Sequence, residues 1–147
     1  MSVTETYVDA PPEAVFEVLS DPQSYAHWVV GASRTRKADA AWPEPGTRFH
    51  HTQGFFGLGL PDNTEVLKAS PPKRLVLEAR IRPFAVNKVD LRLHPRGAGT
   101  RVTMVEYPTG GIAKLVDNPL IDFALHLRNI ESLRRLRRMA EERRSKN

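Results

Sequence analysis

Residues 75–107 read LVLEARIRPFAVNKVDLRLHPRGAGTRVTMVEY, and apolar and polar side chains alternate along most of this stretch. Alternation with a period of two predicts strands that are buried on one face. The pattern predicts strands over Leu75–Arg82, Val86–Leu93 and Thr100–Tyr107, with a hairpin connection at Pro95–Gly99. Because the other face of each strand is polar, we expect an antiparallel sheet with one face exposed to water.

Earlier residues continue the same pattern. Four further strands are expected, over Ser2–Val8, Gly31–Lys37, Thr47–Gln53 and Thr64–Ala69. The glycine-rich, apolar segment Gly54–Pro61 is interpreted as the loop between two of them. It is either a mobile flap over a cavity mouth or an ordinary hairpin connection.

Helical patterns occur after the first strand and at the end of the chain. Two short helices are predicted over Pro12–Leu19 and Gln23–Ala26, and Pro12 suits a first helical turn. A long helix is predicted over Asn118–Arg143, with an apolar stripe formed by Phe123, Leu127, Ile130, Leu133, Leu136 and Ala140.

These elements predict an α+β fold in one domain spanning residues 1–147. A curved seven-stranded antiparallel sheet wraps around the long C-terminal helix, and two short helices follow the first strand. A curved sheet and a straight helix cannot touch along their whole length. We therefore expect a concave, apolar cavity between them, which is the usual form of a small-molecule site.

Composition narrows the function classes. The 147 residues include no cysteine, which excludes disulfides, cysteine-based zinc sites and a cysteine nucleophile. The N-terminus lacks the pattern of a signal peptide, and no apolar run approaches the ~20 residues of a membrane span. We expect a cytoplasmic protein without a transmembrane segment.

Several segments, in this order, resemble the START-like (helix-grip) superfamily in its polyketide cyclase/dehydrase-like branch. They are VDAPPEAVFEVLSDPQSYAHW (8–28), PGTRFHH (45–51), TEVLKASPPKRLVLEARIRP (64–83), GAGTRVTMVEYPTGG (97–111) and the closing arginine-rich helix. The resemblance implies the helix-grip fold and an internal cavity for lipids, polyketides or other apolar molecules. It does not imply a reaction, because the superfamily contains carriers, sensors, receptors and enzymes.

Strand parity predicts which side chains line the cavity. If Val102 and Met104 point inward, Glu106 does too, and Phe49 brings His51 and Gln53 with it. The predicted ligand-binding residues are Trp28, Phe49, His51, Gln53, Thr64, Leu77, Ala79, Ile81, Leu91, Met104, Glu106, Phe123 and Leu127.

Glu106 has three interpretations. It could act with His51 in general acid–base catalysis, it could contact a polar group of a ligand, or it could pair structurally with an arginine. An apolar cavity disfavours a charged carboxylate unless a cation or hydrogen bond donors compensate for the lost water. Glu106 and His51 are therefore the candidate catalytic residues, if there is catalysis.

No metal site is expected, because His50 and His51 point to opposite faces of a strand and the other histidines lack ligand spacing. No cofactor is expected either. The net charge is +5, and eight arginines and lysines lie in the last twenty residues. Aromatic residues do not interleave with them, so a solvated helix face, balanced in part by Glu131, Glu141 and Glu142, is favoured over a specific nucleic-acid site.

Three functions remain. The first is a carrier or binding protein for an apolar small molecule, acting as a monomer or homodimer. The second is a polyketide cyclase or dehydratase, and the third is an interaction module that binds RNA or an acidic membrane through the basic helix.

Overall fold

The computed structural model describes residues 1–30, 32–55, 58–81, 85–110 and 119–146. The elements, in chain order, are β1 (Ser2–Val8), α1 (Pro12–Leu19), the 3-10 turn η1 (Pro22–Ser24), α2 (Tyr25–Trp28), β2 (Ala32–Ala38), β3 (Arg48–Phe55), β4 (Leu58–Ser70), β5 (Arg74–Ile81), β6 (Ala85–Arg96), β7 (Gly99–Gly110) and α4 (Pro119–Lys146).

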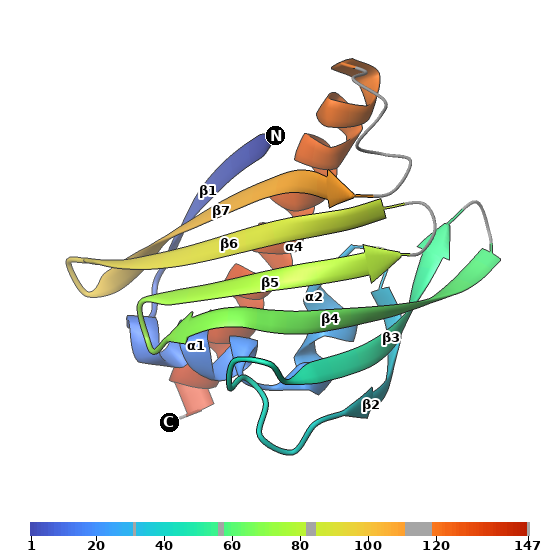
Figure 1. The fold of residues 1–147 in the computed structure, drawn as a ribbon. Coiled ribbons are helices and arrows are strands. Elements are labelled where there is room, and N and C mark those ends of the chain that lie inside the picture. Colours follow the sequence, from blue (N-terminus) through green and yellow to red (C-terminus); the bar gives the residue numbers. More distant parts are fainter. Residues whose placement is uncertain (31, 56–57, 82–84, 111–118, 147) are drawn as a thin grey trace.

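The seven strands form one antiparallel sheet in the order β1-β7-β6-β5-β4-β3-β2. Figure 1 shows the sheet curving around α4, with α1 and α2 closing the lower part of the concave side. This arrangement confirms the predicted fold class. Pro12 opens α1, and the Asp21 side chain accepts a hydrogen bond from the Gln23 backbone N–H at the start of η1.

One predicted boundary is wrong. The segment Gly54–Pro61 was expected to be a loop, yet β3 continues to Phe55 and β4 begins at Leu58. Gly54 pairs with Gly59 and Phe55 with Leu58, so the ladder hydrogen bonds override the low strand propensity of glycine. Residues 56 and 57, where a flap would turn, lie outside the described residues.

The core lies at one end of the space between sheet and helix. Tyr25, Trp42 and Phe49 pack as an aromatic cluster, with ring centroids 4.7–5.8 Å apart. The Tyr25 hydroxyl and the Trp42 indole N–H both donate to the carbonyl of Leu19, at 2.7 and 3.1 Å. These bonds satisfy the polar tips of two buried aromatic residues and hold α1 against the sheet.

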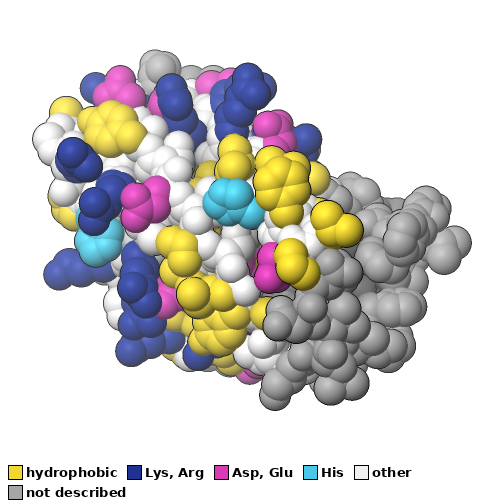
Figure 2. Space-filling view, turned by 90° about the horizontal axis from the view of Figure 1, so that it is seen from above, with side chains coloured by type: hydrophobic (Ala, Val, Ile, Leu, Met, Phe, Trp, Pro, Cys, Tyr) yellow, Lys and Arg dark blue, Asp and Glu magenta, His cyan; other side chains and the backbone are white. Residues whose placement is uncertain are grey.

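Helix α4 differs from its predicted pattern. Leu133, Leu136 and Ala140 are buried as expected, whereas the apolar side chains of its first half are exposed: Leu120, Phe123, Leu127 and Ile130. Figure 2 shows hydrophobic side chains gathered on the surface at this end of the molecule. The inner face of this first half instead carries the polar residues Asn129 and Ser132, both 2% exposed. Asn129 faces a polar part of the sheet, described next, whereas Ser132 Oγ accepts a hydrogen bond from the Val30 backbone N–H after α2.

Candidate functional site

Glu106 lies near the end of β7 and faces inward. Val102, Met104 and Glu106 are all at most 3% exposed, while Thr103 and Val105 are more accessible. The prediction from strand parity is therefore confirmed for this residue. A carboxylate buried this deeply needs partners that replace its hydration.

Those partners come from α4 and β6. Arg128 Nη2 donates to Glu106 Oε1 at 2.8 Å and to Oε2 at 2.9 Å. Asn87 Nδ2 donates to Oε2 at 3.0 Å. Both carboxylate oxygens are thus engaged, in the charge-assisted geometry that stabilises an ionised carboxylate. This is the structural pairing with an arginine that the sequence left open, and it leaves Glu106 poorly placed to act as a general base.

A polar network extends from this ion pair to β1. Arg128 Nη2 also donates to Asn129 Oδ1 at 3.4 Å, and Asn129 Nδ2 donates to Ser2 Oγ at 3.5 Å. Ser2 Oγ lies 3.3 Å from His126 Nδ1 and 3.4 Å from Thr4 Oγ1. These longer contacts are weaker than the ion pair. Together they explain why β1 turns its polar side inward and leaves Val3 and Tyr7 exposed.

One donor of the network has no acceptor. Among the described residues, Nε of Arg128 is buried without a hydrogen bond partner, and so is Nε1 of Trp28 on α2. An unpaired buried donor costs about 1–3 kcal/mol, so such groups generally bind water or a ligand. Nε of Arg128 is therefore a buried donor that no described residue satisfies, next to the ion pair with Glu106.

The inward faces of the middle strands are apolar and unequally buried. Leu75 and Leu77 on β5 and Leu91 on β6 are at most 4% exposed, whereas Ala79 and Val89, further toward the β5–β6 connection, are partly exposed. Leu133 and Leu136 of α4 belong to the same buried cluster as the three leucines, Val89 packs against the edge of this cluster, and Ala79 is not part of it. The inner side of the sheet is thus closed at the α1 end and accessible at the other.

The register brings several predicted residues together. Phe49 pairs with Thr64, Thr64 with Ala79, and Ala79 with Asn87, which places the four side by side across the sheet. The predicted residues that prove buried are Trp28, Phe49, Thr64, Leu77, Leu91, Met104 and Glu106.

Other predicted residues are not brought to this face. Phe123 is 61% exposed and Leu127 is 51% exposed, because the inner face of α4 is occupied by Asn129, Ser132 and Leu133 instead. The side chains of His51, Gln53 and Ile81 lie outside the described residues. The strand of His51 is separated from that of Glu106 by β4, β5 and β6, so the two residues are not on neighbouring strands.

Sequence reasoning missed Arg128, Asn87 and Asn129 as site residues. Asn87 has the inward parity of Val89 and Leu91, and Asn129 lies four residues before Leu133. Those spacings place both on inward faces. Arg128 was counted with the basic C-terminal helix, although it lies six residues before the next arginine.

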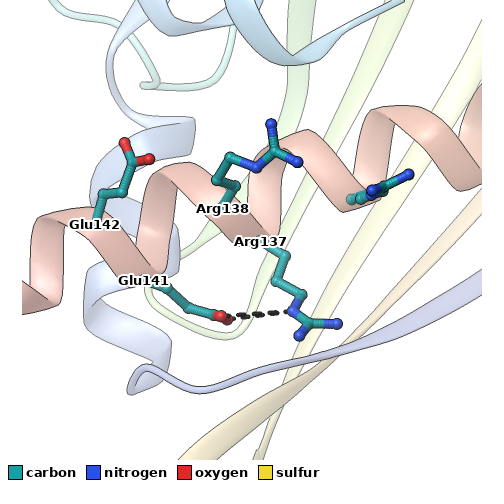
Figure 3. A pocket seen from close by; sticks show the side chains of 5 residues that line it. Arg137, Arg138, Glu141 and Glu142 are labelled. Atoms are coloured by element: carbon teal, nitrogen blue, oxygen red, sulfur yellow. Dashed lines mark hydrogen bonds and ion pairs between the residues drawn. The ribbon is translucent and has the colours of Figure 1, made fainter.

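The basic half of α4 carries a separate hollow on its outer surface. About 550 Å³ in volume, it is lined by Arg134, Arg137, Arg138, Glu141 and Glu142 (Figure 3). Arg137 Nε bonds Glu141 at 3.2 Å within this hollow, and Arg135 bonds Glu131 at 3.1 Å nearby. Acidic side chains thus offset much of the positive charge, in line with a solvated helix face.

The described residues contain no group of three or more histidine and acidic side chains arranged to hold a metal ion. Within the same residues, no helix is both long and apolar enough to span a bilayer.

Comparison with known structures gives the same fold. The chain is similar to protein NE0264 from Nitrosomonas europaea (19% identity, TM-score 0.75, covering 97% of this chain and 95% of that one). It is also similar to CV1439 from Chromobacterium violaceum (18% identity, TM-score 0.73, 95% of each chain). DynU16, from the dynemicin biosynthetic locus, shares 20% identity at a TM-score of 0.68, over 95% of this chain and 46% of DynU16.

No curated protein matches the sequence. The profile of one family, described as polyketide cyclase/dehydrase and lipid transport, matches residues 1–141. The helix-grip architecture and this match over nearly the whole length agree, and the chain therefore belongs to the polyketide cyclase/dehydrase and lipid transport family.

Proposed function

We propose that the protein binds an apolar small molecule, of lipid or polyketide type, between the sheet and α4, and acts as a carrier or binding protein. Support comes chiefly from the inward face of the middle strands. Ala79 and Val89 are apolar, point inward and remain partly exposed, beside an inward-facing polar cluster around Arg128. Apolar walls with a few convergent polar groups are the usual composition of a selective small-molecule site.

Binding is favoured over catalysis because of the state of Glu106. An acid–base cyclase or dehydratase needs a group that can take up and release a proton near the substrate. Both oxygens of Glu106 already accept hydrogen bonds from Arg128 and Asn87. The family description names polyketides and lipids, and both are compatible with an apolar site.

Binding of Nile red, an uncharged apolar dye, tests the proposal. Wild-type protein should bind it saturably, at about one dye per chain, with a blue-shifted emission. Ala79→Trp should abolish binding without unfolding, because the larger side chain fills the accessible space over β5. Leu67→Trp, which adds an indole at an exposed position of β4, is the matched control and should bind like wild type.

Two outcomes would contradict the proposal: no saturable binding to the wild type, or unchanged binding to folded Ala79→Trp. Leu127→Trp adds a further comparison. If that exposed position also controls binding, the first turns of α4 line the site, as the sequence analysis predicted.

A further inference from the structure

The polar end of the proposed site has balanced charge. Glu106, which is 3% exposed, and Arg128 form an ion pair here, and their formal charges neutralise each other. The neighbouring groups are the neutral amides of Asn87 and Asn129 and the hydroxyls of Ser2 and Thr4. His126 lies at the edge of the network, with its Nδ1 atom 3.3 Å from Ser2 Oγ.

The group in this cluster that lacks a hydrogen bond partner is a donor. Arg128 Nε is buried and lacks an acceptor among the described residues, while Nη2 of the same guanidinium is committed to Glu106. An oxygen atom of a ligand would satisfy this N–H. A carbonyl oxygen can do so without adding charge.

A ligand carboxylate could accept a hydrogen bond from Arg128 Nε, but the charge of Glu106 would repel it. It would bring a second negative charge to within a few ångströms of Glu106, in a region where Glu106 is 3% exposed and water screens poorly. Two carboxylates around one guanidinium leave a net buried negative charge, and like charges in such a site disfavour ionisation of both.

Resting on the function proposed above, we infer that the ligand's polar end is an uncharged hydrogen bond acceptor, such as a ketone or ester carbonyl, and that Glu106 excludes carboxylates. Glu106 is then a specificity-determining residue. Its pairing with Arg128 sets the charge of the head group that the site accepts.

The test compares 2-tridecanone with dodecanoate, which share an undecyl chain and differ in head group. Each displaces Nile red at pH 8, below its aggregation concentration. The wild type should bind the ketone about 10- to 100-fold more tightly, given the repulsion of two charges a few ångströms apart at an intermediate dielectric constant. Glu106→Gln removes one negative charge and should shift the acid-to-ketone affinity ratio by at least about tenfold toward the acid.

Glu5→Gln provides the matched control, because Glu5 is exposed on β1 and lies opposite Thr103 on β7. This variant makes the same charge change on the outer face of the sheet and should leave the acid-to-ketone affinity ratio unaltered. Circular dichroism checks that each variant folds. Equal or tighter binding of dodecanoate to the wild type would overturn the inference, even if Glu106→Gln failed to fold, and would leave the proposed function standing. Failure of the dye and both ligands to bind would overturn the proposed function instead.

Discussion

Arg128→Met should destabilise the protein far more than Glu106→Gln does. The reason is the unequal burial of the two partners: the Glu106 side chain is 4% exposed and that of Arg128 is 29% exposed. Removing the arginine leaves the buried Glu106 carboxylate without its cation, at a place that water cannot reach. Removing one partner of a buried pair costs about 3–5 kcal/mol, and we take the lower end, about 3 kcal/mol, because Asn87 still donates to the carboxylate. In a chain of this length that corresponds to a fall of roughly 6–12 °C in Tm.

The Glu106→Gln variant keeps Arg128, the more accessible partner of the ion pair. The arginine can bond water, and the new amide oxygen still accepts a hydrogen bond, so the expected cost is about 1 kcal/mol. Replacing both residues, as Glu106→Leu with Arg128→Met, should return the stability to within about 1 kcal/mol of wild type or above it.

Urea unfolding of the wild type and the variants at pH 7 measures these differences. The reasoning is refuted if Arg128→Met costs no more than Glu106→Gln, or if the double variant is as unstable as Arg128→Met alone.

Three further outcomes are expected. Burial of Asp90 on the outer face of the sheet acts to raise the pKa of its carboxyl, but hydrogen bonds and positive charge from Arg74 and Arg92 outweigh burial, and the pKa is lowered. Asp90→Asn should therefore decrease the free energy of unfolding at pH 7. The variant should also lose less stability than the wild type on acidification, since the wild-type contribution of Asp90 disappears as the pH falls through its lowered pKa. Leu136→Ala, at a fully buried position, should cost about 2–5 kcal/mol by urea unfolding, whereas Leu127→Ala should change stability by less than about 0.5 kcal/mol. Burial, followed by the charge of Asp21, raises the pKa of Tyr25 far above its usual value near 10, so the ultraviolet absorbance of its phenolate should develop only as the protein unfolds in alkali; early ionisation in the folded state would contradict its placement.

Regular alternation made most of the sheet predictable. The first strand and first helix match their predicted bounds, and the inward orientation of Glu106 followed from its parity with Val102 and Met104. Period-two and period-3.6 patterns are local, so they can be read from short windows of sequence. The extension of β3 and β4 through Gly54 and Gly59 was missed because it depends on pairing between strands rather than on residue propensity.

The partners of Glu106 are a tertiary property. Arg128 follows it by 22 positions in the sequence, and nothing local to either residue specifies the contact. The apolar stripe with Phe123, Leu127 and Ile130 is expected from sequence to face the sheet, with Phe123 and Leu127 lining the cavity, on the rule that apolar faces point inward. That rule fails here because the opposing strand, β1, presents Ser2 and Thr4, and a polar helix face with Asn129 satisfies them better.

The unequal burial along β5 and β6 separates the residues that keep the protein folded from those that would contact a ligand at the proposed site. Substitutions at Leu75 or Leu91, in the closed end, fall on fully buried side chains and are penalised in every sequence background. Substitutions at Ala79 or Val89 alter accessible wall positions and leave the closed end untouched. A chain built this way can change its ligand by small steps, each compatible with folding. Laboratory evolution toward a new cargo should therefore accumulate its changes near Ala79, Asn87 and Val89, and few in the half that packs on α1.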